Sequence, residues 1–218
     1  MTEHQHDPGD WTWKFTDSFW DEHYGSKKAL WSGNPNPVLV SEVADLPGGR
    51  ALDVGCGEGA DTIWLADRGW EVLGIDVSQV ALDRAAANVA AAGLSGRVSF
   101  ERRDLLEWAP DPRSFDLVSA QFFHLPAELR PPVYDGLAAA VAPGGTLLVV
   151  AHSPSDLHTT VNRPPAAELF FTSDELSERL DDDWDVQVSE ARQRVTTDGE
   201  GREVTISDSV LKARRTSG

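Results

Sequence analysis

The chain has 218 residues, of which 40% are hydrophobic, and this length suits one domain with a buried core. Its formal net charge of −17 disfavours binding to nucleic acid or to an anionic membrane surface, because both carry negative phosphate groups. A single cysteine excludes an internal disulfide, no apolar run reaches the roughly 18–20 residues of a membrane span, and no secretion signal opens the chain, so we expect a cytoplasmic protein.

Residues 1–47 are predicted to form a helical segment that covers a ligand site. Half of the eight tryptophans fall in the first 31 residues: Trp11, Trp13, Trp20 and Trp31. A short helix is expected over 16–24, capped by Thr16 or Asp17. A turn rich in Gly and Pro follows at 32–37, and Pro37 begins a second helix that runs to residue 46.

Residues 48–218 are predicted to form the main domain, in which strands and helices alternate. Strands are expected at 51–54, 71–75, 98–101, 115–120 and 146–152. Helices are expected at 60–68, from the Ser78 cap to about 92, and at 127–142, where Pro131 and Pro132 delay the start. This alternation predicts a mostly parallel sheet with helices on both faces.

The C-terminal part differs from this alternation. A capped helix is expected at 173–180, followed by strands at 184–195 and 204–214 with the hairpin sequence DGEG (198–201) between them. The predicted fold is therefore a Rossmann-like three-layer sandwich, with a mostly parallel seven-stranded sheet and an antiparallel C-terminal hairpin.

A glycine-rich stretch, ALDVGCGEG (51–59), joins the first strand of this domain to a helix that starts at Ala60. Glycines let the backbone approach a ligand closely, and the helix N-terminus offers free N–H groups. Asp76 ends the second strand about 20 residues later, where a carboxylate can accept the hydroxyls of a ribose. The spacing predicts a site for a nucleoside-containing cofactor.

Two further acids favour S-adenosylmethionine over a dinucleotide. Asp53 precedes the glycines, where it would repel a pyrophosphate and attract an ammonium group. After the third strand, Asp104 is placed to accept the adenine amine while the N–H of Leu105 meets a ring nitrogen. The alternatives are a dinucleotide at the same glycines and a purely structural, loop-capping Asp53.

At this point the chain resembles the class I S-adenosylmethionine-dependent methyltransferases. The resemblance rests on LDVGCGEG (52–59), VLGIDVS (72–78), RRDLLEW (102–108), FDLVSAQFFHLP (115–126) and PGGTLLVV (143–150), in the family's order. The stretch 20–37 looks like the small-molecule branch that includes tellurite-resistance and thiopurine methyltransferase-like proteins. The cofactor site that this implies consists of Trp20, Trp31, Asp53, Gly55, Cys56, Gly57, Asp76, Val77, Asp104, Leu105 and Gln121.

The candidates for the methyl-acceptor side follow the fourth and fifth strands. His124 and His152 are predicted catalytic residues, as a general base, with hydrogen-bonded structural histidines as the alternative. A metal cluster of His152, Asp156 and His158 is the weaker reading, and we expect no metal. Arg163 is a candidate for an anionic substrate. An apolar wall or core packing is expected for four rings: Phe122, Phe123, Phe170 and Phe171.

The sequence thus predicts an enzyme that methylates a small molecule by in-line displacement, as a monomer or homodimer without nucleic-acid or membrane partners. The acceptor classes left open are thiols, other chalcogen species, phenols and amines. Two rival hypotheses are an NAD(P)-dependent oxidoreductase and a non-catalytic S-adenosylmethionine-binding protein. A methyltransferase acting on a macromolecule is disfavoured by the charge.

Overall fold

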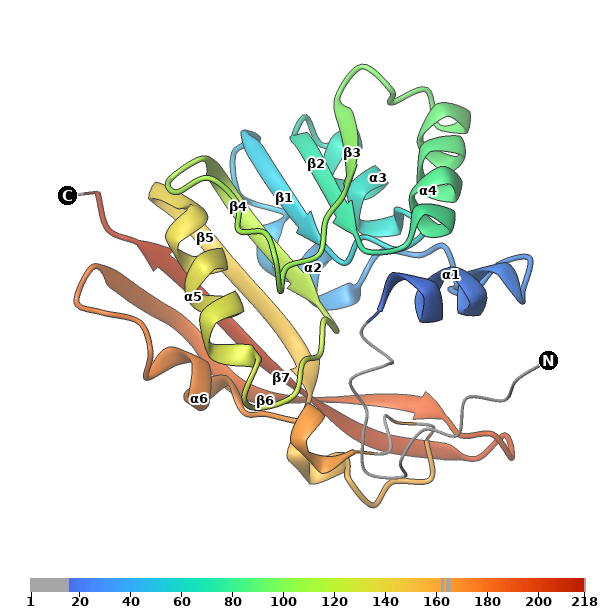
Figure 1. Cartoon of the computed structure of the whole chain (residues 1–218). Helices are drawn as coiled ribbons and strands as arrows, with labels where there is room; N and C mark the ends of the chain where they lie inside the picture. The colour runs from blue at the N-terminus through green and yellow to red at the C-terminus, as the bar shows by residue number, and fades with distance from the viewer. Residues whose placement is uncertain (1–15, 162, 164–165, 218) are drawn as a thin grey trace.

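A seven-stranded sheet organises the part of the chain that this computed structural model describes, residues 16–161, 163 and 166–217. Its strand order is β3-β2-β1-β4-β5-β7-β6 (Figure 1). The strands are β1 (Arg50–Val54), β2 (Glu71–Asp76), β3 (Val98–Arg102), β4 (Phe115–Gln121), β5 (Val141–His152), β6 (Trp184–Thr197) and β7 (Glu203–Arg215). β1 to β5 pair in parallel, whereas β7 pairs antiparallel with β5 and with β6. The predicted fold class is confirmed.

Apart from α5, the helices begin within one residue of the predicted starts. They are α1 (Asp17–Gly25), α2 (Pro37–Val43), α3 (Ala60–Asp67), α4 (Gln79–Ala91), α5 (Arg130–Ala140) and α6 (Ser173–Ser177), with short 3₁₀ turns η2 (Pro154–Asp156) and η3 (Ala167–Leu169). The Thr16 side chain accepts a hydrogen bond from the Phe19 N–H, and Ser78 accepts one from the Ala81 N–H. Trp11 and Trp13 lie outside the described residues.

α5 begins at Arg130, three residues into the predicted range, because a proline fits only in the first turn of a helix and Pro131 and Pro132 delay the start as expected. Three predicted boundaries were wrong: the start of β5 and the ends of α2 and α6. β5 begins at Val141, because the glycine pair lies inside the strand at a register shift and Gly144 adopts a φ of 79°. α2 and α6 end three residues early, where the chain closes with tight i→i+3 hydrogen bonds such as Leu46 N–H to Val43 O.

Two apolar clusters cover the two faces of the sheet. On one face, α5 and α6 pack over β1, β4 and β5 through residues that include Leu137 and Leu176. On the other, α2 and α3 pack through residues that include Leu39 and Leu65. α4 packs against β2, β3 and α3. α2 is therefore part of a helical layer, and within the described part of residues 1–47 it is α1 and the chain after it that reach the glycine loop.

The C-terminal hairpin is longer than the strand on which it packs. β5 pairs with β7 only from residue 208 onwards, so β6 from Gln193 and β7 up to Ser207 pair only with each other. We call residues 193–207 the hairpin arm, which extends past the end of β5 (Figure 1). Ser207 N–H donates to the Asp156 carboxylate, and Thr160 Oγ1 bonds Asp198, so the segment after β5 is tied to the arm.

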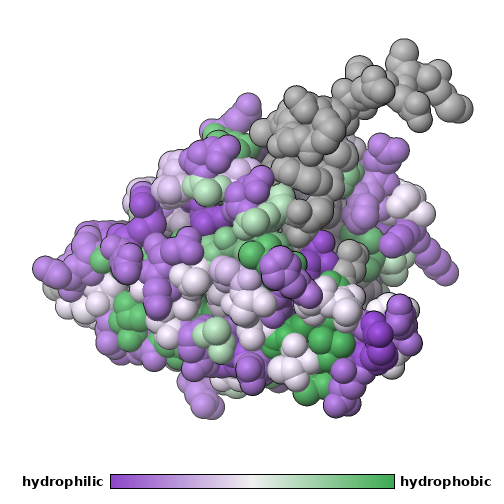
Figure 2. Space-filling view, turned by 90° about the horizontal axis from the view of Figure 1, so that it is seen from below, coloured by the Kyte–Doolittle hydropathy of each residue, from purple (hydrophilic) through white to green (hydrophobic). Residues whose placement is uncertain are grey.

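The surface seen from below is mostly hydrophilic, with apolar areas in separate patches (Figure 2). Among the described residues, the large exposed hydrophobic side chains are Trp31, Leu106, Leu157, Val186 and Val195. Within the same residues, no helix has the length and apolar character needed to cross a membrane.

Candidate cofactor and acceptor site

The glycine loop between β1 and α3 adopts a backbone that other residues rarely adopt. Gly55, Gly57 and Gly59 have φ angles of 64°, 53° and 85°, all in the left-handed region. A Cβ atom on Gly57 would lie 2.9 Å from the Tyr24 hydroxyl oxygen and 3.3 Å from Trp31 Nε1. The loop is therefore closed on one side by residues from the N-terminal segment, as the sequence predicted for Trp31.

Three carboxylates surround this loop. Asp53, 2% exposed, accepts a hydrogen bond from Thr62 Oγ1 at 2.5 Å. Asp61, in the first turn of α3, accepts one from the Asn36 N–H at 2.6 Å. Asp76, at the end of β2, accepts from the N–H groups of Gly57 (3.0 Å) and Ser78 (2.9 Å).

No Lys or Arg pairs with these three acids among the described residues. Burial raises the pKa of each, and the charge of Asp61 raises the pKa of Asp53 further. Buried like charges without a counterion disfavour ionisation of the free site. The arrangement is suited to a ligand that brings positive charge and hydroxyl donors to the loop.

The other predicted cofactor residues follow the carboxyl ends of neighbouring parallel strands. Asp104 follows β3 and accepts from the Leu106 N–H at 2.9 Å, with Leu105 half-buried beside it. Gln121 ends β4; its Nε2 donates to Ser119 Oγ, while its Oε1 is buried without a partner. This unpaired acceptor needs a donor from a ligand.

Cys56 and Val77 meet their neighbours mainly through backbone atoms. The Cys56 N–H donates to Ile75 O at 2.9 Å, and Val77 O accepts from Arg102 Nε at 3.0 Å. Burial first, then the charges of Asp53 and Asp76, raise the pKa of the Cys56 thiol. The thiol is therefore protonated and suited to packing and not to nucleophilic attack.

Two charged side chains fasten the N-terminal segment over the loop. Glu58 accepts hydrogen bonds from the N–H groups of Leu30 and Trp31 and pairs with Arg84 Nη1 at 2.8 Å. Arg84 also donates to the carbonyls of Tyr24 (2.8 Å) and Lys27. Burial alone would raise the pKa of Glu58, but these hydrogen bonds outweigh it and lower the pKa. Glu58 is thus ionised when the segment is in place.

The aromatic residues of this segment divide into two groups. Trp31, 56% exposed, donates from Nε1 to the Tyr24 hydroxyl at 3.0 Å, so both lie at Gly57. Trp20 packs on its neighbours in α1, with ring centroids 5.4 Å from Phe19 and 6.0 Å from Tyr24. The structure brings Trp31 to the loop directly, and Trp20 through Tyr24.

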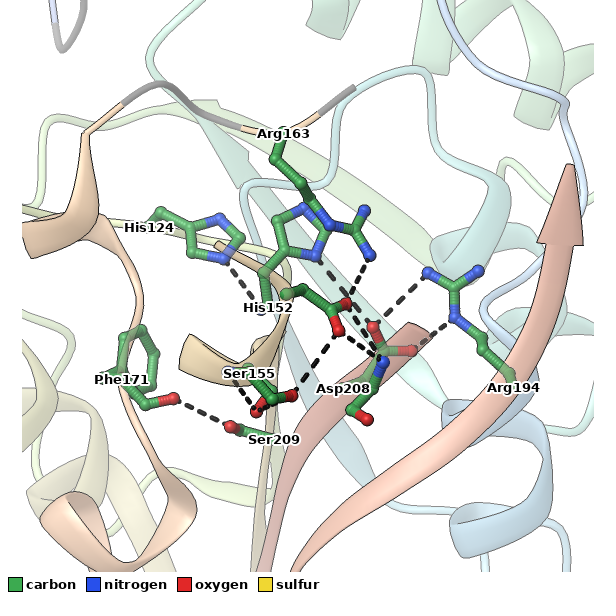
Figure 3. Close-up of polar contacts among 11 residues, drawn as sticks. His124, His152, Ser155, Arg163, Phe171, Arg194, Asp208 and Ser209 are labelled. Atoms are coloured by element: carbon green, nitrogen blue, oxygen red, sulfur yellow. Dashed lines mark hydrogen bonds and ion pairs between the residues drawn. The ribbon is translucent and has the colours of Figure 1, made fainter. Parts of the chain in front are cut away.

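A second polar cluster lies where β4 and β5 end, beside Asp208 of β7 (Figure 3). His152 ends β5, and its Nδ1 lies 4.0 Å from Asp208 Oδ1 of β7. Asp208, 2% exposed, accepts from Arg194 Nε at 2.5 Å and from Nη2 at 3.4 Å. Arg194 belongs to the hairpin arm and Asp208 directly follows it, so the long hairpin supplies both the acid beside His152 and the arginine that pairs with this acid.

His124 and His152 have different surroundings. His124 Nε2 accepts a hydrogen bond from the His152 backbone N–H at 3.0 Å. Burial, with the nearby His152 ring, lowers the pKa of His124 to about 3, so it is neutral. Burial also lowers the pKa of His152, against the opposing effect of Asp208. Its Nδ1 is buried without a hydrogen bond while its side chain is 15% exposed, so Nε2 is the nitrogen left for a ligand.

The turn after β4 sends consecutive rings to different places. Phe122 has a φ of 55°, rare for a residue with a side chain, and its ring lies 4.7 Å from that of His152. Phe123 lies against the glycine loop, where its Cδ2 would be 3.3 Å from a Cβ on Gly55. Phe170 and Phe171 are buried in apolar clusters, as in the core-packing alternative.

The remaining candidates of the segment after β5 are Asp156 and Arg163, which pair with each other, and His158. Asp156 is buried, accepts from the Ser207 N–H and pairs with Arg163 Nη2 at 3.0 Å. His158 is exposed. Among the described residues, no group of three or more His, Cys, Asp or Glu side chains could hold a metal ion.

Sequence reasoning missed several residues that the structure brings to the site. Tyr24 lies one helical turn after Trp20, a spacing that could have indicated it. Asp61 shares the first turn of α3 with the loop. Arg84, Arg194 and Asp208 gave no signal, because their partners are far away in the sequence.

Known proteins resemble this chain in sequence and in fold. The family described as "Methyltransferase domain" matches residues 51–145. A 2-heptyl-1-hydroxyquinolin-4(1H)-one methyltransferase from Mycobacteroides abscessus is 30% identical over 175 residues, which cover 78% of this chain and 74% of that protein. Thiocyanate methyltransferase 1 from Brassica oleracea is 29% identical over 142 residues, which cover 63% of this chain and 62% of that protein. The crystal structure of TehB from Haemophilus influenzae superposes with a TM-score of 0.69 at 20% identity, covering 92% of this chain and 67% of that one.

Proposed function

The chain belongs to the class I S-adenosylmethionine-dependent methyltransferases, and we propose that it methylates a small molecule bound between the glycine loop and His152. The observation that carries this proposal is the loop itself. Three acids meet there beneath an aromatic pair, Tyr24 and Trp31: Asp53 is buried, Asp61 and Asp76 are half-buried, and none has a basic partner among the described residues. A cofactor with a ribose, an ammonium and a sulfonium matches those groups, whereas a pyrophosphate would be repelled.

The residues present fit this cofactor at each of its parts. We assign the ribose hydroxyls to Asp76 and the adenine amine to Asp104, which lie at the ends of adjacent strands. The ammonium group is assigned to the unpaired Gln121 Oε1 and to the field of Asp53. The sulfonium is assigned to the face of Trp31 beside Tyr24, because an aromatic face attracts a cation.

We further propose that the described part of residues 1–47 before α2 acts as a cover for this cofactor. The ties that support it are the Glu58–Arg84 pair and the bonds that Asp21 accepts from Ser78 Oγ and the Val80 N–H. All of them connect the segment to the glycine loop or to the start of α4. The cover is therefore held in place by polar groups of the glycine loop and of α4, next to the cofactor site.

The acceptor is proposed to be a small molecule with an oxygen, sulfur, other chalcogen or nitrogen nucleophile. The names of the relatives include an N-hydroxyquinolone and thiocyanate, which supports a small acceptor. Methyl transfer gives a neutral leaving group, so the main contribution of the protein is to hold nucleophile and methyl in line. His152 is the better placed of the two histidines to take a proton, because His124 Nε2 is already hydrogen-bonded.

Thermal unfolding in the presence of candidate cofactors tests the proposal. At about 100 times its dissociation constant, S-adenosylmethionine or S-adenosylhomocysteine should add about 2.7 kcal/mol, a rise in Tm of roughly 5–11 °C. Asp76→Ala should lose this rise, and NAD and NADP should give none. Production of S-adenosylhomocysteine with a panel of phenols, N-hydroxy compounds, thiols and amines then identifies the acceptor. Stabilisation by dinucleotides alone would overturn the proposal, and binding without turnover on any acceptor would leave a cofactor-binding protein.

A further inference from the structure

From the polar cluster at the carboxyl end of β5, beside Asp208 of the antiparallel β7, we infer that His152 takes a proton from a hydroxyl-type acceptor and that Asp208, held by Arg194, is the positioning residue for this step. The inference rests on the proposed function and narrows it. It selects acceptors that enter protonated, such as phenols and N-hydroxy compounds, over anions such as thiocyanate.

The geometry around His152 has the features of an oriented base. Nδ1 is buried, lacks a hydrogen bond, and lies 4.0 Å from the buried Asp208 carboxylate. Of the two imidazole nitrogens, Nδ1 is the one that faces the Asp208 carboxylate, so the carboxylate favours a proton on Nδ1 and leaves Nε2 unprotonated. The His152 backbone N–H donates to His124 Nε2 (Figure 3), and the His152 ring packs against the rings of Phe122 and His124, with centroids 4.7 Å away in each case.

Arg194 keeps Asp208 in place and ionised. Its guanidinium contacts both carboxylate oxygens, with Nε 2.5 Å from Oδ2. Burial alone would raise the pKa of Asp208, but His152 and Arg194 outweigh it and lower the pKa. Four groups therefore face His152: Asp208 from β7, Arg194 from β6, Arg163 from the segment after β5, and His124 from the turn after β4.

The chemical step balances with these residues and the proposed cofactor. The acceptor oxygen forms the new carbon–oxygen bond, and the methyl–sulfur bond breaks with its electron pair staying on sulfur. The hydroxyl proton moves to His152 Nε2, and the resulting imidazolium faces the Asp208 carboxylate before it releases the proton to solvent. An anion such as thiocyanate has no proton to give, so it would not need this pair.

The test compares five variants with 2-heptyl-1-hydroxyquinolin-4(1H)-one, phenol and thiocyanate as probes. His152→Gln should lower kcat for a hydroxyl acceptor by about 100-fold or more, in the range of general-base catalysis. Asp208→Asn should lower it about 10-fold at unchanged KM for the cofactor, and should move the rise of kcat to lower pH, because an imidazolium without its carboxylate is less stable. Asp208→Glu should restore part of the loss. Arg194→Met should also lower kcat, because Asp208 loses the guanidinium that holds it, but without the shift to lower pH, since the charge of Arg194 itself lowers the pKa of His152. Arg192→Met, which removes an arginine paired with Glu42 and Glu190, should leave kcat unchanged.

A spectroscopic measurement decides the inference without turnover. With ¹⁵N-labelled imidazoles, His152 in the free protein should carry its neutral-form proton on Nδ1, and its pKa should fall in Asp208→Asn. The opposite tautomer, or a pKa that does not change, would overturn the inference, as would equal losses in His152→Gln for thiocyanate and for a hydroxyl acceptor. Failure of the proposed function is seen separately, as an absence of stabilisation by S-adenosylmethionine in the wild-type chain.

Discussion

Replacing Gly57 with alanine separates the two roles that the structure gives to this residue. The first is backbone conformation: φ is 53°, and a left-handed residue with a Cβ costs about 1–2 kcal/mol. The second is space, because the new Cβ would lie 2.9 Å from the Tyr24 hydroxyl, closer than real Cβ contacts. To relieve the contact, Tyr24 and Trp31 must move away from the loop.

Gly93→Ala is the matched control for this experiment. Gly93 ends α4 with a φ of 74°, so alanine meets a similar backbone cost, but nothing lies within 4 Å of the added Cβ. Both variants should therefore lose about 1–2 kcal/mol, or roughly 2–8 °C in Tm for a chain of this size. Only Gly57→Ala should also lose the rise in Tm on addition of S-adenosylmethionine.

The assay is differential scanning fluorimetry of the two variants with and without S-adenosylmethionine and S-adenosylhomocysteine, followed by calorimetric measurement of the dissociation constants. If Gly57→Ala binds both ligands as tightly as Gly93→Ala, the aromatic pair does not adjoin the cofactor. The assignment of Trp31 to the sulfonium would then be wrong. Equal loss of ligand binding in both variants would show that backbone strain, and not the contact with Tyr24, is responsible.

Three other changes test separate parts of the account. Burial, with the charge of Asp61, raises the pKa of Asp53 to about 7, and a cationic ligand favours its ionised form. Affinity for S-adenosylmethionine should therefore rise with pH until the pH exceeds this pKa, and binding should release a proton. Calorimetry in two buffers with different ionisation enthalpies detects this release, and proton uptake would contradict the electrostatic argument. Glu58→Gln should weaken cofactor binding about 5- to 30-fold by freeing the Trp31 backbone, whereas Glu22→Gln on exposed α1 surface should not, as dissociation constants would show. Leu137→Ala, on the buried side of α5, should lower the free energy of unfolding in urea by about 2–5 kcal/mol with little change in affinity for S-adenosylmethionine. An unchanged free energy of unfolding would contradict the packing.

Much of the fold was predictable because local signals agree with the global arrangement. Ser78 caps α4, Pro37 begins α2, and DGEG joins the last two strands, each as the sequence indicated. The start of β5 could not be placed, because Val141 pairs with Phe115 across a register shift that depends on a neighbouring strand. The early ends of α2 and α6 have a different cause, because tight local hydrogen bonds close the chain there.

The site was predictable to the extent that it lies on the strand ends. The positions of the loop glycines and of Asp76 follow from the order of strands and helices, whereas the hydrogen bond from the Gly57 N–H to Asp76 was not predicted. In contrast, the partners of His152 come from a hairpin more than 40 residues further on, Arg194 and Asp208. No spacing rule connects residues that meet only when β7 inserts between β5 and β6.

The left-handed backbone at Phe122 lets the turn after β4 direct two consecutive rings to opposite faces of the sheet. Phe122 belongs to the apolar cluster on one face of the sheet and Phe123 to the cluster on the other, although one peptide bond joins them. Phe123 touches the glycine loop, and Phe122 lies 4.7 Å from the ring of His152. The turn therefore connects the surroundings of the glycine loop and of His152 through two consecutive residues.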